Sequence, residues 1–123
     1  LRKLNIDSSY FKKKEKLFGK LINKKIIVKQ LLFEEYFTHK DINHIDLLKI
    51  DTEGYEYEVL KGLKKNISKV SIIIFEHHYD NMILKDYTFG DINYFLKKNN
   101  FQKVFKSKMP FRKSFEYIYT RKN

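Results

Sequence analysis

The sequence predicts an α/β fold in which a mostly parallel sheet closes with an antiparallel hairpin at its edge. Two aliphatic runs, Ile45–Ile50 and Val70–Phe75, have the composition of strands buried on both faces. The roughly twenty residues between them predict a helix, so these segments form a βαβ unit with parallel strands. Near the C-terminus, two further strands flank a loop that holds the only proline, Pro110, and this pattern favours an edge hairpin.

The composition is that of one packed domain. The chain has 123 residues, of which 42% are hydrophobic and 16% aromatic, and this length can bury a sizeable core. The absence of cysteine excludes disulfides, thiolate zinc sites and cysteine nucleophiles, and it favours an intracellular location. No run has the length of a membrane span, and Leu1–Tyr10 lacks the apolar centre of a signal peptide. We therefore expect a soluble cytoplasmic protein.

The formal net charge of +11 would suit binding to nucleic acid or to an anionic membrane surface. The basic residues, however, occur as short clusters in predicted turns and at helix ends: Lys12–Lys14, Lys24–Lys25, Lys64–Lys65 and Lys97–Lys98. Arginine forks and aromatic stacking residues are not concentrated on one predicted element. We expect no dedicated nucleic-acid site, and the sequence leaves the oligomeric state open.

Along the chain, residues 1–24 form a polar, lysine-rich lead-in with one short helix expected around Tyr10–Leu21. Residues 25–123 then follow the order β-α-β-α-β-α-β-β with no linker. The expected elements are the strand Lys25–Gln30, a helical turn over Leu32–Phe37, a polar loop over His39–His44, the strand Ile45–Ile50, a helix over Thr52–Lys61, the strand Val70–Phe75, a helix over Thr88–Lys98 ended by Asn99–Asn100, and the strands Gln102–Phe105 and Phe115–Thr120.

The helix expected over Thr52–Lys61 has signals at both ends. Thr52 or Asp51 can cap its N-terminus, and acidic residues in its first turns suit the positive end of the helix dipole. Gly62 marks its end. Its apolar residues lie on one face, so it can pack on a sheet; they are Tyr55, Val59 and Leu63, with Leu60 beside them.

The chemistry is expected beyond the carboxyl ends of the parallel strands, where ligands bind in open α/β sheets. Two segments qualify: Asp51-Thr52-Glu53-Gly54 after the first buried strand and Glu76-His77-His78-Tyr79 after the second. If the second strand continues through its segment, Glu76 and His78 share one side and His77 faces the other way.

The run Ile45–Gly62, IDLLKIDTEGYEYEVLKG, resembles the K-I-D-x-E-G-x-E-x-x-x-L-x-G signature of FkbM-type methyltransferases. A following strand that ends in Glu76 fits the same pattern, and Lys25–Phe37 resembles the preceding strand and short helix start, departing from it at Gln30-Leu31-Leu32. The resemblance covers most of Lys25–Asn123. The matched signature positions are Lys49, Ile50, Asp51, Glu53, Gly54, Glu56, Leu60 and Gly62.

The resemblance implies a Rossmann-like class I methyltransferase sheet and transfer of a methyl group from S-adenosylmethionine to a hydroxyl of a sugar or natural product. The acceptor would be a small molecule or a glycan. Asp51 is the first candidate for the catalytic carboxylate that orients or deprotonates the acceptor, and Glu53 is the second. Glu76 and His78 would line the opposite wall, with His78 as a general base because histidine titrates near neutral pH. Asp51 and Glu76 are also the candidates for cofactor contacts.

Each of these residues has a purely structural alternative. Asp51 could only cap the following helix, Glu53 could only favour the helix dipole, and Gly54 could only allow close packing of helix and sheet. Tyr55 is expected in the core. A metal held by Asp51, Glu53, Glu76 and one histidine is geometrically conceivable, but no pair of histidines is spaced to converge from one element. We expect no metal site.

The cofactor side of the cleft is not evident in the sequence. Class I methyltransferases hold the cofactor through a glycine-rich turn, whereas Gly19, Gly54, Gly62 and Gly90 stand singly here, and the chain begins at Leu1. We expect the chain to be the C-terminal part of such an enzyme and to be inactive by itself. The alternative is a small, basic, non-catalytic binding or scaffold module that keeps the methyltransferase-like fold.

Overall fold

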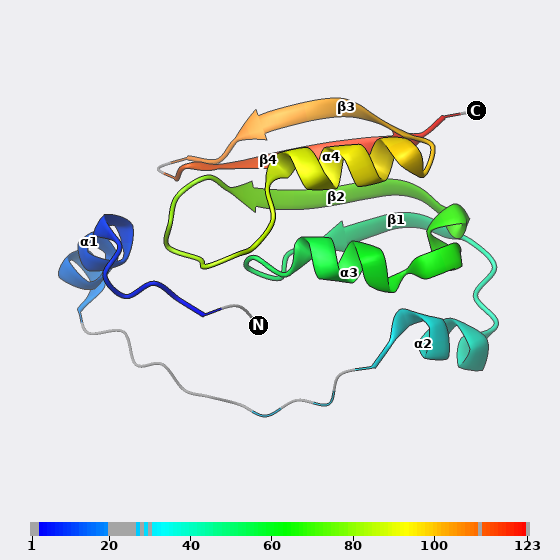
Figure 1. Cartoon of the computed structure of the whole chain (residues 1–123), viewed down its shortest axis with the longest axis horizontal. Coiled ribbons are helices and arrows are strands. Elements are labelled where there is room, and N and C mark those ends of the chain that lie inside the picture. The colour runs from blue at the N-terminus through cyan, green and yellow to red at the C-terminus, as the bar shows by residue number, and fades with distance from the viewer. Residues whose placement is uncertain (1–2, 20–26, 28, 30, 111, 123) are drawn as a thin grey trace.

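The computed structural model describes residues 3–19, 27, 29, 31–110 and 112–122, and these form a mixed α/β structure (Figure 1). The strand expected over Lys25–Gln30 falls mostly outside the described residues. The elements, in chain order, are α1 (Ser9–Phe18), α2 (Phe33–Lys40), β1 (Ile45–Ile50), α3 (Glu56–Gly62), the short 3-10 helix η1 (Lys64–Lys69), β2 (Val70–His78), α4 (Phe89–Lys98), β3 (Phe101–Lys108) and β4 (Ser114–Arg121).

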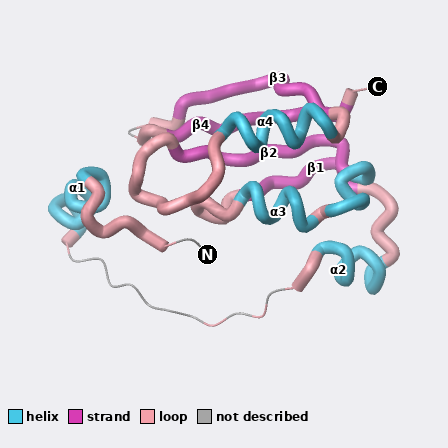
Figure 2. Tube along the Cα trace, in the orientation of Figure 1, coloured by secondary structure: helices cyan, strands magenta, loops and turns pink. Residues whose placement is uncertain are grey.

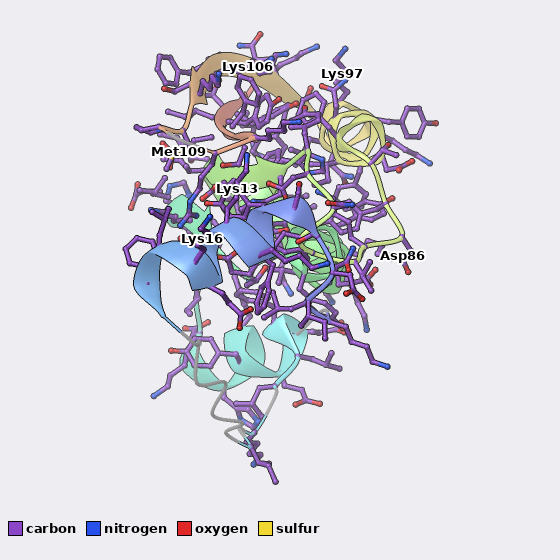
Figure 3. The ribbon with its side chains drawn as sticks, turned by 90° about the vertical axis from the view of Figure 1, so that its left-hand side faces the viewer. Lys13, Lys16, Asp86, Lys97, Lys106 and Met109 are labelled. Atoms are coloured by element: carbon purple, nitrogen blue, oxygen red, sulfur yellow. The ribbon has the colours of Figure 1, made fainter. Side chains whose placement is uncertain are left out.

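One sheet of four strands organises the molecule, in the order β1-β2-β4-β3. β1 and β2 are parallel, whereas β4 runs antiparallel to both β2 and β3. The expected βαβ unit and the antiparallel hairpin at the sheet edge are therefore both confirmed. α3 and α4 cover the same face of the sheet, as the views in Figures 2 and 3 agree.

The core lies between this face of the sheet and the two helices. Ile73 and Phe75 of β2 are fully buried there, and the Phe75 ring stacks on Tyr117 and Tyr119 of β4 at centroid distances of 5.5 and 5.8 Å. Leu96 of α4 is fully buried in the same cluster. Because strand side chains alternate between faces, Phe75 and Ile73 point to the helices and their neighbours point away.

The opposite face of the sheet is less covered within the described part of the chain. Leu47 of β1 and Phe105 of β3 each expose about half of their surface, at 52% and 51%. The expectation that the strand Ile45–Ile50 is buried on both faces is therefore wrong at Leu47. The physical reason is position, because β1 lies at one edge of the sheet and α3 and α4 cover one face only.

α3 begins four residues later than the sequence predicts. Its N-cap is Tyr55, without a side-chain cap hydrogen bond, so neither Asp51 nor Thr52 caps the helix. The backbone instead forms a loop with positive φ at Glu53 (50°) and Gly54 (93°). Tyr57 packs against the core, whereas Tyr55, which the sequence places in the core, is half-buried at the helix start.

The polar end of β2 also differs from the sequence prediction. Glu76, His77 and His78 were expected to follow the strand, but they are its last three residues and pair with Glu116, Phe115 and Ser114 of β4. This pairing with β4 supplies the hydrogen bonds that keep a polar segment extended.

The prediction for α4 is confirmed, since Thr88 caps it through a capping box with Asp91 and Asn99 ends it. At α2, His39 lies in the last turn of the helix and not in a loop.

The N-terminal helix packs on the segment between β2 and α4. Ser8 caps α1 by accepting a hydrogen bond from the Phe11 backbone N–H, and Phe11 packs with Met82 and Ile83. Leu4 forms a β-bridge with Ile83. None of the described helices has the length and apolar character needed to cross a membrane.

Candidate functional site

The candidate site lies at the carboxyl ends of β1 and β2, which are parallel neighbours in the sheet. Residues 51–55 follow β1, and residues 79–88 follow β2. Because parallel neighbours end at the same edge, the two loops and the last residues of β2 meet there.

Glu56 joins these two loops. Its carboxylate is 2% exposed, and Oε1 accepts hydrogen bonds from the backbone N–H of Thr52 (3.1 Å), the Thr52 hydroxyl (3.1 Å) and the backbone N–H of Gly54 (3.0 Å). Oε2 accepts a hydrogen bond of 2.6 Å from the Tyr87 hydroxyl. Burial alone would raise the pKa of Glu56, but the hydrogen bonds from Tyr87 and the loop backbone outweigh it and hold the pKa below its ordinary value. Glu56 therefore stays ionised as a structural anchor.

Three of the predicted site residues converge beside this anchor. The His78 Nε2 atom lies 3.2 Å from Glu53 Oε2 and 3.5 Å from Glu76 Oε1. Arg112, from the loop between β3 and β4, approaches the same Glu76 oxygen, with its Nη1 atom 3.8 Å away. We call Glu53, Glu76, His78 and Arg112 the carboxylate cluster.

The members of the carboxylate cluster differ in exposure. The side chains of His78 and Glu76 are 3% and 12% exposed, whereas that of Glu53 is 54% exposed. Glu76 Oε1 and His78 Nδ1 are buried atoms that make no hydrogen bond to the described residues. Glu53 is thus the carboxylate that faces solvent, and His78 lies behind it.

Asp51, the first candidate from the sequence, lies at the start of the same loop and is exposed. It makes no hydrogen bond or ion pair within the described part of the chain. The structure therefore brings Glu53, Glu76 and His78 together, and it leaves Asp51 available at the rim of the site.

His77 points to the other face of the sheet, as the strand alternation predicts. Its ring packs against Tyr79 and Tyr87 at centroid distances of 4.8 and 5.9 Å. Burial, together with the nearby Lys85 ammonium, lowers the pKa of His77 to about 4. Lys85 contacts the His78 carbonyl oxygen and lies 3.3 Å from His77 Nε2, and burial also lowers the pKa of Lys85. This arrangement holds His77 neutral and anchors the end of β2.

The sequence did not indicate Glu56, Lys85 or Arg112 as parts of the site. Glu56 is one of the matched signature positions, which was a usable signal, but its place near a helix start suggested only a dipole effect. Arg112 reaches Glu76 through the register of the hairpin, which no local pattern reveals. No group of three or more described histidine, aspartate and glutamate side chains is arranged to hold a metal ion.

A model of the FkbM methyltransferase domain matches residues 3–103. The chain belongs to this family. No curated protein and no solved structure matches it. The FkbM match includes α1 and every member of the carboxylate cluster except Arg112, which lies beyond the matched residues. The family assignment supports methyltransferase activity, and the carboxylate cluster is the candidate for where it resides.

Proposed function

We propose that this FkbM-family chain takes part in methyl transfer from S-adenosylmethionine to a hydroxyl group of a sugar or natural product. One observation carries the proposal: the half-exposed carboxylate of Glu53 meets His78 and Glu76 at the carboxyl edge of two parallel strands. The sheet order supports a further step, that the four strands are the C-terminal part of a Rossmann-like class I sheet.

The described residues fit one end of the cofactor. The sulfonium and amino groups of S-adenosylmethionine are cationic, and carboxylates are suited to bind them. Glu76, whose buried Oε1 lacks a hydrogen bond to the described residues, and the exposed Asp51 are the groups proposed to contact it. Bound there, the cofactor would supply a methyl group already activated for transfer. We found no glycine-rich turn in the sequence that would take the adenosine part, so we propose that the isolated chain does not turn over.

Glu53 is the group proposed to contact the acceptor. S-adenosylmethionine bound here would supply the methyl group and keep the sulfur, and the Glu53 carboxylate, or Asp51 of the same loop, would take the proton that the acceptor hydroxyl loses. His78, with a 3% exposed side chain, would act through Glu53 by fixing the orientation of its Oε2 atom. His78 is then a positioning residue and not the base that touches the acceptor.

The test joins the chain to a segment that carries the glycine-rich turn of a class I methyltransferase, such as any coding sequence found upstream of it. We expect the joined protein to transfer labelled methyl groups to hydroxyl acceptors. Glu53→Gln should lower kcat by about 10²-fold or more, because the proton acceptor is lost, with KM nearly unchanged. Glu58→Gln on α3 is the matched control and should keep full activity.

The outcomes separate the candidates. Loss of turnover in Asp51→Asn with full turnover in Glu53→Gln would assign the base to Asp51 and remove Glu53 from the reaction. A joined protein that binds no S-adenosylmethionine in calorimetry would overturn the proposed function altogether. That result would favour the basic, non-catalytic module considered from the sequence.

A further inference from the structure

A groove of about 1070 Å³ lies between α1, the loop after β2 and the loop between β3 and β4. Figure 3 looks onto this end of the molecule, with α1 in front and Lys13 on its side nearer to Met109 of the hairpin loop. This volume is slightly above the range of about 300–1,000 Å³ that is usual for small-molecule sites. Its cationic lining residues are Lys13, Lys14, Lys108, Arg112 and Lys113, and Asp80 is its one described acidic residue.

The walls of the groove are held by tertiary contacts. The Asn5 backbone N–H donates to the Met82 carbonyl (2.7 Å), and the Leu84 N–H donates to the Lys3 carbonyl (3.1 Å), so the segment leading into α1 is tied to the loop after β2. On the other side, the Tyr79 N–H donates to the Lys113 carbonyl (2.7 Å). The segments that carry the cations of α1 and of the hairpin loop are therefore tied to the loop after β2, and their side chains line one hollow.

The positive charge of the groove is largely unneutralised. Among the described residues, Arg112 pairs with Glu76, and the four lysines of the lining make no ion pair. Cations around a concave surface add their potentials and attract an anion more strongly than the same charges spread over a convex face. A multiply charged anion is the ligand that such a lining favours.

The groove also adjoins the carboxylate cluster. Arg112 belongs to both, and Tyr79 of the groove directly follows His78. We propose that the groove binds the phosphate or diphosphate group of the methyl acceptor, so that the acceptor is a phosphate-bearing compound such as a sugar diphosphate ester. This rests on the proposed function, because it makes the groove the anchor for a hydroxyl presented to Glu53. Tyr10 on α1 and Tyr79 offer rings on which a sugar or base can stack.

An anionic membrane surface is the competing ligand, because Leu17 and Phe18 of α1 are 77% and 76% exposed next to the lysines. The shape of the site favours the small anion. Lys13 of α1 and Lys113 of the hairpin loop line the same hollow, into which a small diphosphate can enter, whereas a flat membrane surface would meet only its rims.

The experiment measures binding of inorganic pyrophosphate and of uridine diphosphate to the full chain by calorimetry, without cofactor, at low and physiological salt. We expect both probes to bind, and Lys13→Glu/Lys113→Glu to weaken them about tenfold or more by removing two charge-assisted contacts. The matched control is Lys97→Glu/Lys98→Glu on α4, which has the same net charge but changes no groove residue. It should bind as the wild type does.

Equal weakening in the two double variants, or no binding of either probe by the wild type, would overturn the proposal. Binding to vesicles of phosphatidylglycerol that is lost in Lys13→Glu/Lys113→Glu, without binding of the soluble probes, would also overturn it and assign the groove to a membrane. Glu53→Gln should keep the full affinity for pyrophosphate. Pyrophosphate binding in the groove, together with a joined protein that neither binds S-adenosylmethionine nor transfers methyl groups, would show that the proposed function fails and the anion site stands.

Discussion

Glu56 is the side chain through which the two loops of the site are held together. It accepts four hydrogen bonds while almost fully buried. We expect Glu56→Gln to lower the free energy of unfolding by about 2 kcal/mol, because a buried charge-assisted network loses its charge and one of its acceptors. Urea denaturation measures this. The control is Glu58→Gln, because Glu58 forms a partly exposed ion pair with Lys61. This substitution should change the free energy of unfolding by less than about 0.5 kcal/mol. Equal effects would show that Glu56 anchors nothing.

His77 makes the stability of the protein dependent on pH. Its folded-state pKa of about 4 lies below its ordinary value of 6.5, so between these values the unfolded chain binds more protons and stability falls as pH falls. Above pH 6.5 the residue contributes no pH dependence. We expect it to cost about 2 kcal/mol between pH 7 and pH 5.

The measurement for His77 is denaturant unfolding across this pH range. The His77→Gln variant keeps an acceptor for Lys85 but has no group that titrates there. Between pH 7 and pH 5, its free energy of unfolding should therefore fall by about 2 kcal/mol less than that of the wild type. Glu56, whose pKa is lowered from 4.5, keeps its contribution above that value and loses it as pH falls further, so it adds little between pH 7 and pH 5. Parallel pH profiles of wild type and His77→Gln would contradict the assignment.

At the scale of elements, the loop between β1 and α3 depends on one glycine. Gly54 has φ of 93°, a conformation that side chains with a Cβ rarely adopt. We expect Gly54→Ala to lower the free energy of unfolding by about 1–2 kcal/mol. Gly62, the last residue of α3, has open space where a Cβ would lie, so Gly62→Ala should stabilise by up to about 1 kcal/mol. Thermal unfolding of the two variants distinguishes the signs, and equal signs would contradict the loop geometry.

The elements that the sequence predicts best are those set by local pattern. β1 has the expected bounds, and the capped helix α4 differs by one residue, because aliphatic runs and capping residues act within a few positions. The predicted start of α3 was wrong because the Glu56 carboxylate accepts hydrogen bonds from the backbone N–H groups of Thr52 and Gly54 and holds them in a loop. The predicted end of β2 was wrong because its last, polar residues are paired with β4, a strand that begins 36 residues after His78.

At the scale of the whole molecule, the sheet should show unequal protection from hydrogen exchange. β2 is paired on both sides, whereas β1 and β3 have one described neighbour each. We expect amides of β2 to exchange only through global unfolding and alternate amides of β1 to exchange much faster. Exchange measured by NMR on the dilute chain tests this. Full protection along β1 would show that its open edge is covered by another segment or another copy.

The tertiary contacts of the candidate site could be predicted only in part. Glu53 and His78 come together as expected because neighbouring parallel strands end at one edge. The packing of Phe11 on Met82, which holds α1 beside the groove, joins residues far apart in the chain through two apolar side chains with no distinctive pattern. Contacts of this kind depend on the folded topology and leave no local signal.

Arg112, which lies beyond the residues matched by the family model, connects the carboxylate cluster with the groove. Its guanidinium lies 3.8 Å from Glu76 Oε1 and also lines the groove, so an anion in the groove and the Glu76 carboxylate would compete for one cation. By thermodynamic reciprocity, each weakens the other's interaction by the same factor. Removing the carboxylate charge by Glu76→Gln should therefore tighten the binding of pyrophosphate in the groove, which calorimetry measures. One side chain thus links the occupancy of the groove to the arrangement of the carboxylate cluster.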